Sequence, residues 1–192
     1  MPFAISPRHT SDDFQGTLTL DNKVEVFIAR VEGWQLGVAK EMIQKQVPHR
    51  AFALLHMLTS YFEMIAKYHA GFVGQRRSTE HFKKGVRLVF PAIEPEAEAF
   101  LNSLYDSVRN GLYHTGMTGS NAILADNLPG SVGYNSQHNM IMVSSDQLAE
   151  DLWIHFTAFA AALRDPANTE LRSNFERRFD SDNALALSAQ VA

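Results

Sequence analysis

The sequence predicts an all-α protein, a bundle of four long antiparallel helices with additional short helices and a small β-hairpin or loop insertion. Three observations predict this class. Apolar residues recur at three- and four-residue steps through most of the chain, Pro or Gly ends the periodic segments, and the connections between most of these segments are short. Four long helices joined in this way are typical of helical bundles.

The length of 192 residues is that of one domain, and 45% hydrophobic residues are enough to build one core. We expect an extended N-terminal lead-in at residues 1–20, because Pro and Gly occur there without a sustained period. A single helical-bundle domain is expected at residues 21–181, with an insertion at residues 116–145. A flexible tail is expected at residues 182–192.

Capping residues and helix-breaking Pro and Gly place the ends of the helices. The expected helices are a first capped by Asp21 and ending at Pro48, a second from His49 to Gly71, a short one at residues 80–90, a third from Pro95 to Gly116, a fourth from Ser145 to Pro166, and a last one around residues 171–179. Within the insertion, the apolar runs Ala122–Ala125 and Met140–Val143 stand among Gly, Asn, Ser and Pro, which predicts a small hairpin or a long loop.

The composition excludes several kinds of site. The chain has no Cys, so disulfides, thiolate metal sites and thiol nucleophiles are excluded. It also lacks paired Glu-x-x-His motifs, HExxH and a phosphate-binding glycine loop, so no metal or cofactor is expected. A net charge of −4 argues against a broad surface for a nucleic-acid backbone. Without a signal peptide or a membrane span, the sequence predicts a soluble, cytoplasmic protein.

The most informative residues are RNGLYH, from Arg109 to His114, at the end of the third long helix. The surrounding stretch, LYDSVRNGLYHTG, resembles the signature of the HEPN superfamily, whose third helix carries Arg, then often Asn or another polar residue, and then His. Here these are Arg109, Asn110 and His114. The resemblance covers residues 21–165 in helix order and about a dozen residues in detail.

The resemblance implies metal-independent RNA cleavage of the toxin or defence type, in which a ribose hydroxyl attacks the neighbouring phosphate and leaves a cyclic phosphate end. An imidazole changes charge near neutral pH, so His114 suits proton transfer. The Arg109 guanidinium would hold the phosphate, since its planar fork matches phosphate oxygens. Asn110 would orient the phosphate or the imidazole. Glu63 matches an acidic position of the family and would orient His114 or pair with Arg109.

Members of this type commonly dimerise, so the resemblance also implies a homodimer in which two Arg–His motifs face one cleft. Five residues on an ideal α-helix turn through about 140°, which would place Arg109 and His114 on different faces. Gly111 between them favours a bend or an end of the helix, and a second subunit would relax the same constraint. RNA and a cognate antitoxin or partner protein are the partners implied.

Other interpretations of these residues stay open. The spacing by itself is not specific, since Arg50 and His56 are separated similarly. Basic residues near a helix C-terminus also interact favourably with the helix dipole. Glu63 is spaced to pair with Lys67 on its own helix. His56 and His69 lie on the apolar side of their helix in the sequence pattern and are expected as hydrogen-bonded core residues rather than metal ligands. The tryptophans are expected in the core or in a dimer interface.

The densest basic segment would either guide an RNA backbone or form a solvated surface; its members are Arg76, Arg77, Lys83, Lys84 and Arg87. A well-known nuclease subgroup has Tyr two residues after the His, where this chain has Gly116. This departure favours a second hypothesis, a non-catalytic HEPN-like module that binds RNA, a nucleotide or a protein. A third hypothesis is a bundle that resembles the family by chance and binds proteins through residues 116–145.

Overall fold

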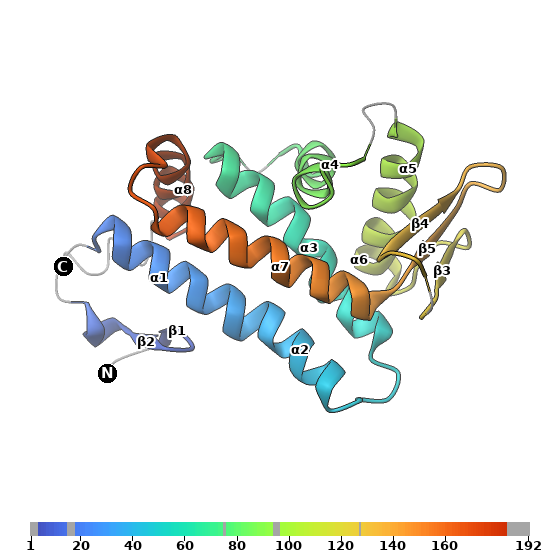
Figure 1. The fold of residues 1–192 in the computed structure, drawn as a ribbon, viewed down its shortest axis with the longest axis horizontal. Helices are drawn as coiled ribbons and strands as arrows, with labels where there is room; N and C mark the ends of the chain where they lie inside the picture. The colour runs from blue at the N-terminus through green and yellow to red at the C-terminus, as the bar shows by residue number, and fades with distance from the viewer. Residues whose placement is uncertain (1–3, 15–17, 75, 94–96, 127, 184–192) are drawn as a thin grey trace. The chain divides into compact units, whose positions relative to one another are not determined.

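The computed structural model describes residues 4–14, 18–74, 76–93, 97–126 and 128–183. These residues are mostly helical, as the sequence predicts, and they include two small sheets (Figure 1). The predicted tail lies outside the described residues from residue 184 onward. The chain divides into two compact units, one formed by residues 1–38, 67–76 and 156–192 and the other by residues 39–66 and 77–155.

The first unit begins with a hairpin rather than with the extended lead-in that we expected. Strands β1 (Ala4–Ser6) and β2 (His9–Thr10) pair antiparallel, and a 3₁₀ turn follows at Ser11–Asp13. Helix α1 (Leu20–Arg30) is capped by Thr19, whose hydroxyl oxygen accepts a hydrogen bond from the amide of Asn22. The prediction of Asp21 as the cap is wrong by two residues, because Thr19 is the last residue with an extended backbone.

The expected first helix is not continuous. A π-helical turn, Val31–Leu36, separates α1 from α2 (Gly37–Gln44), which ends before the predicted stop at Pro48. A π turn holds more residues than an α turn, so it rotates the following side chains away from the α-helical stripe. Trp34, which we expected in the core or in a dimer interface, is 53% exposed, and Val38 is 41% exposed.

Helix α8 (Thr169–Asp182) completes the first unit and packs on α1. The Phe27 ring lies 4.4 Å from the Tyr68 ring and 5.3 Å from the Phe175 ring, measured between centroids. The buried ammonium of Lys23 lies 2.8 Å from one carboxylate oxygen of each of two acidic residues on α8, Glu176 and Asp180. Burial opposes the charge of Lys23, but these hydrogen bonds outweigh it and raise its pKa above 10.5.

The second unit contains most of α3 (Ala51–Ala70), the first half of α7 (Ser145–Arg164) and α4 (Ser78–Val89), all close to their predicted bounds. Helices α3 and α4 approach very closely, since a Cβ built on Gly85 would lie 1.8 Å from the carbonyl oxygen of Phe62. The rings of Phe62 and Phe82 lie 5.3 Å apart across this contact.

The predicted third long helix is divided into three parts, α5 (Glu98–Ser103), a π-helical turn (Leu104–Asn110) and α6 (Gly111–Thr115). The three parts still bury hydrophobic side chains at three- and four-residue steps, namely Leu101, Leu104, Tyr105, Val108 and Leu112.

The insertion forms a three-stranded sheet beside α5 and α6 (Figure 1). Its strands are β3 (Ala122–Leu124), β4 (Val132–Asn135) and β5 (Met140–Val143), in the order β3-β5-β4. The two apolar runs, for which we expected a small hairpin or a long loop, are β3 and β5, and they pair in parallel. The hairpin is formed instead by β4 and β5, because the short turn after Asn135 joins these two strands.

Candidate functional site

The RNGLYH segment lies where the π-helical turn Leu104–Asn110 passes into α6. A π turn shifts the helical hydrogen-bond pattern and leaves a backbone carbonyl for another partner. Here the carbonyl oxygen of Ser107 accepts a hydrogen bond of 2.6 Å from the amide of Gly119, in the loop before β3. The insertion therefore holds the distorted turn that carries Arg109 and Asn110. Such turns are frequent at functional sites.

Position 111 requires glycine because another part of the backbone lies very close to it, and not because the helix bends there. The helix neither bends sharply nor ends there, because Gly111 has the right-handed helical conformation and α6 continues to Thr115. A Cβ at this position would lie 2.6 Å from the carbonyl oxygen of Met117. The expected distortion does exist, but it lies in the π turn immediately before the glycine.

Arg109 is held by an ion pair with the predicted acidic residue of α3. Its Nη2 donates to Oε2 of Glu63 at 3.2 Å, and the two side chains are only 17% and 16% exposed. The other oxygen of Glu63 accepts a hydrogen bond of 2.9 Å from the hydroxyl of Ser78. Of the two roles expected for Glu63 at the site, the structure therefore contains the pair with Arg109.

Two tyrosine rings cover the Arg109 guanidinium. Its Cζ lies 5.5 Å from the ring centroid of Tyr105 and 4.5 Å from that of Tyr113, the residues four before and four after it. Tyr105 is buried and its ring lies 5.3 Å from that of Phe82, so the hydrophobic core supports this stack. Each contact between a cation and an aromatic face contributes about 0.5–2 kcal/mol, depending on its exposure.

The guanidinium keeps donors for a further ligand. It has five N–H donors, and two hydrogen bonds join it to described residues, one to Glu63 and one of 3.2 Å from Nη1 to Oδ1 of Asn110. Asn110 in turn donates from Nδ2 to Asp106 at 3.4 Å. The site thus places a fixed, partly exposed guanidinium next to a carboxamide.

His114 lies in the last turn of α6 and is exposed. Its ring makes no hydrogen bond or ion pair with the residues that the structure describes. The helix ends two residues later at Gly116, whose φ of +72° is left-handed and favours glycine. A Tyr at this position, as in the nuclease subgroup, would be strained. The exposed ring suits proton exchange with a ligand and also suits a favourable interaction with the helix dipole.

His56 joins the site, although the sequence pattern predicted it as a core residue. It is exposed, and its ring centroid lies 5.4 Å from that of the half-exposed Tyr113. His56 and Glu63 are seven residues apart on α3, so both face the RNGLYH segment. The prediction of His69 as a core residue is also wrong, because His69 is exposed near the end of α3.

The predicted basic segment is largely paired with acidic residues. Lys83 and Arg87 lie 2.7 and 2.9 Å from the carboxylate of Glu98, and these hydrogen bonds lower the pKa of Glu98. Arg77 and Lys84 lie 3.2 and 3.0 Å from Glu80. Arg76, the remaining member, is exposed. This pairing favours the solvated-surface interpretation of the segment.

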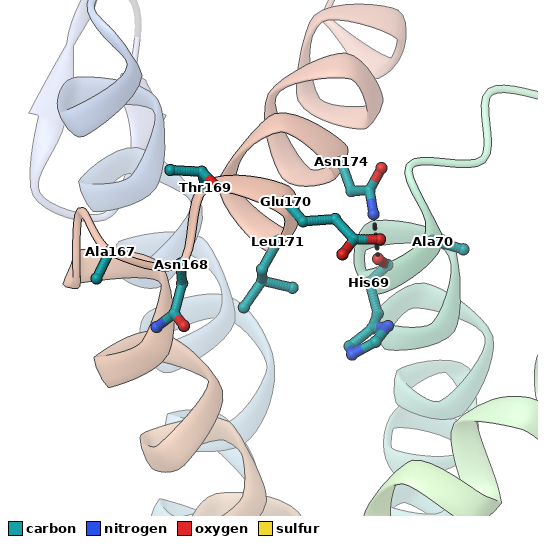
Figure 2. Close-up of a pocket in the computed structure, with 8 residues that line it drawn as sticks. All are labelled: His69, Ala70, Ala167, Asn168, Thr169, Glu170, Leu171 and Asn174. Atoms are coloured by element: carbon teal, nitrogen blue, oxygen red, sulfur yellow. Dashed lines mark hydrogen bonds between the residues drawn. The ribbon is translucent and has the colours of Figure 1, made fainter.

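A pocket of about 720 Å³ lies in the first unit, between the end of α3 and the start of α8 (Figure 2). Its lining residues are His69, Ala70, Ala167, Asn168, Thr169, Glu170, Leu171 and Asn174. Figure 2 shows Glu170 extending from α8 toward α3, and Asn174 donates a hydrogen bond of 3.1 Å to the carbonyl oxygen of His69. Because the backbone carbonyls of Lys67 and Tyr68 also accept hydrogen bonds, the end of α3 is capped by the protein itself.

The aromatic partners of the site were missed by the sequence analysis, although a signal for them exists. Tyr105, Arg109 and Tyr113 follow one another at four-residue steps, which places them along one side of a helix.

Among the residues that the structure describes, no group of three or more His, Asp and Glu side chains could hold a metal ion. No described helix is both long and apolar enough to cross a membrane.

Comparisons with known proteins identify no family for this chain. No protein-family model matches the chain, and no match is found among curated proteins or among solved structures.

Proposed function

We propose that this chain is a HEPN-like helical protein that cleaves RNA without a metal, as a homodimer of the toxin or defence type. Arg109 binds the scissile phosphate, Asn110 orients it, and His114 transfers a proton. The observation that carries this proposal is the anchoring of Arg109 by Glu63 and two tyrosines, with three N–H donors left for a ligand. Fixed donors stabilise the charge that grows on a phosphate during cleavage.

Two further observations support the proposal. The motif begins within a π-helical turn, a distortion common at functional sites, and the insertion holds this turn through the Gly119 amide. The imidazole of His114 is exposed on α6, which directly follows the π-helical turn, so an RNA chain can reach it. The cations of α4 provide limited guidance for the RNA backbone, because they are paired with glutamates.

The test is cleavage of a single-stranded RNA oligonucleotide by the full chain in the presence of a chelator. We expect products with cyclic phosphate ends, and loss of cleavage in His114→Ala and in Arg109→Ala. His138→Ala is the matched control, because His138 is an exposed histidine in the turn between β4 and β5. Cleavage that survives both substitutions would contradict the mechanism. Light scattering during size-exclusion chromatography tests the dimer.

A non-catalytic HEPN-like module is the second candidate, and Gly116 favours it. The backbone of Gly116 is left-handed, and the tyrosine that the nuclease subgroup carries at this position would be strained in that conformation. In this case Arg109 and Asn110 bind RNA, a nucleotide or a protein without cleavage. Binding of an RNA oligonucleotide that requires Arg109 but leaves the oligonucleotide intact would support this candidate over the nuclease.

A further inference from the structure

The proposed cleavage requires two proton transfers. The 2′ oxygen of a ribose forms a bond to phosphorus while the bond from phosphorus to the 5′ oxygen of the next nucleotide breaks. One group must accept the proton of the 2′ hydroxyl, and another must give a proton to the departing 5′ oxygen. Two separate groups allow both transfers in one step, whereas the residues assigned so far supply only one within each subunit, His114.

Besides His114, the described histidines of the second unit differ in their access to the site. His49 is exposed in the turn before α3, and no hydrogen bond, ion pair or ring contact joins it to the RNGLYH segment within the described residues. His81 is buried, with 2% of its surface exposed. His155 is hydrogen-bonded at 2.8 Å to the hydroxyl of the buried Tyr61. His138 lies in the turn between two strands of the insertion. His56, in contrast, is exposed and contacts the ring of Tyr113, which itself covers Arg109.

The carboxylate of the site is less suited to the second transfer. Glu63 accepts hydrogen bonds from Arg109 and from Ser78, and both partners stabilise its anionic form. A carboxylate held in this way does not supply a proton to a leaving oxygen, and because its anion is stabilised it is also a weak acceptor for the proton of the 2′ hydroxyl. An imidazole exchanges protons near neutral pH and suits either transfer.

We propose that His56 is the second proton-transfer group of the RNA-cleaving site, acting together with His114 on a phosphate held by Arg109. This inference rests on the proposed nuclease function. The groups recorded around His56 are the Tyr113 phenol and, beyond it, the Arg109 guanidinium, with Glu63 two turns along its own helix. The cluster of His56, Tyr113 and Arg109 thus places one exposed imidazole near one cation, and the exposed His114 directly follows Tyr113 on α6.

The experiment compares the wild-type chain with His56→Ala, His56→Gln and the control His138→Ala on one RNA oligonucleotide across a range of pH. For both His56 variants we expect kcat to fall about 10²- to 10⁴-fold, with KM little changed, and one limb of a bell-shaped pH profile to disappear. Imidazole added to His56→Ala restores part of the rate. A purely structural role predicts that Gln substitutes for His and that imidazole restores nothing.

A second substrate identifies which transfer His56 performs. Uridine 3′-(4-nitrophenyl phosphate) has a leaving group that departs without a proton, so His56→Ala keeps its activity on this substrate if His56 is the acid and loses it if His56 is the base. The inference is overturned if the wild type cleaves RNA and His56→Ala retains the wild-type kcat and both limbs of the pH profile. The second proton-transfer group then comes from elsewhere, such as a second copy of the chain. Failure of the wild type to cleave RNA at all instead refutes the proposed function.

Discussion

The ion pair between Glu63 and Arg109 should contribute measurably to stability, and Glu63→Gln removes it with almost no change of shape. At 3.2 Å and an effective dielectric constant of about 20, the attraction between the two charges is about 5 kcal/mol. Loss of hydration offsets much of this. Exposed pairs contribute about 0–1 kcal/mol, and removing one partner of a fully buried pair costs about 3–5 kcal/mol. With side chains 16–17% exposed, we expect a loss of about 2 kcal/mol.

Chemical denaturation of Glu63→Gln measures this loss directly, and a thermal melt should show a decrease in Tm of about 4–8 °C for a chain of this length. Glu150→Gln is the matched control, since Glu150 is exposed on α7 and should change stability by less than about 0.5 kcal/mol. Equal stability of Glu63→Gln and Glu150→Gln would refute the argument that Glu63 anchors Arg109.

Two further predictions concern the framework. Gly85→Ala places a Cβ on the backbone of Phe62 and should destabilise the chain by about 1–3 kcal/mol in denaturant, whereas Gly130→Ala, with open space around it, should not; equal effects would contradict the close approach of α3 and α4. Lys23→Met should cost about 1–2 kcal/mol, less than a fully buried pair, because its two partners on α8 are 40% and 43% exposed. Since folding raises the pKa of Lys23, its contribution is complete below pH 10.5 and is lost as the pH rises through the higher folded value. The stability difference between the wild type and Lys23→Met should therefore shrink above that pH, and a difference independent of pH would contradict the role of the charge.

The sequence was sufficient to place the helices because their ends depend on local chemistry. Caps, prolines and the four-residue apolar period located α3, α4, α7 and α8 to within a few residues. The parallel pairing of β3 with β5 was not predictable in this way, since it depends on which runs meet after a long connection. Neither was the cap at Thr19, because Asp21 is an equally good capping residue and only the backbone angles distinguish them.

The resemblance in sequence selected the polar residues of the candidate site but not its geometry. Of Arg109, Asn110, His114 and Glu63, the structure joins the first two and Glu63 by hydrogen bonds. The π turn that carries two of them depends on a contact far along the chain, the hydrogen bond from Gly119 to Ser107, and no local period reveals it. The contact of His56 with the RNGLYH segment was likewise hidden, because an exposed His within an apolar helix resembles a core residue in sequence.

The charges around the site limit how the proposed nuclease would bind RNA. Arg109 has a carboxylate partner, and four of the five cations in the predicted basic segment share two glutamates. A protein that grips many phosphates needs many uncompensated cations, because each neutralised phosphate releases counterions. This chain, with a net charge of −4, instead offers a few N–H donors of the anchored Arg109. If the chain is the nuclease that we propose, recognition of one phosphate within a flexible strand is therefore the mode of RNA binding that best fits these charges.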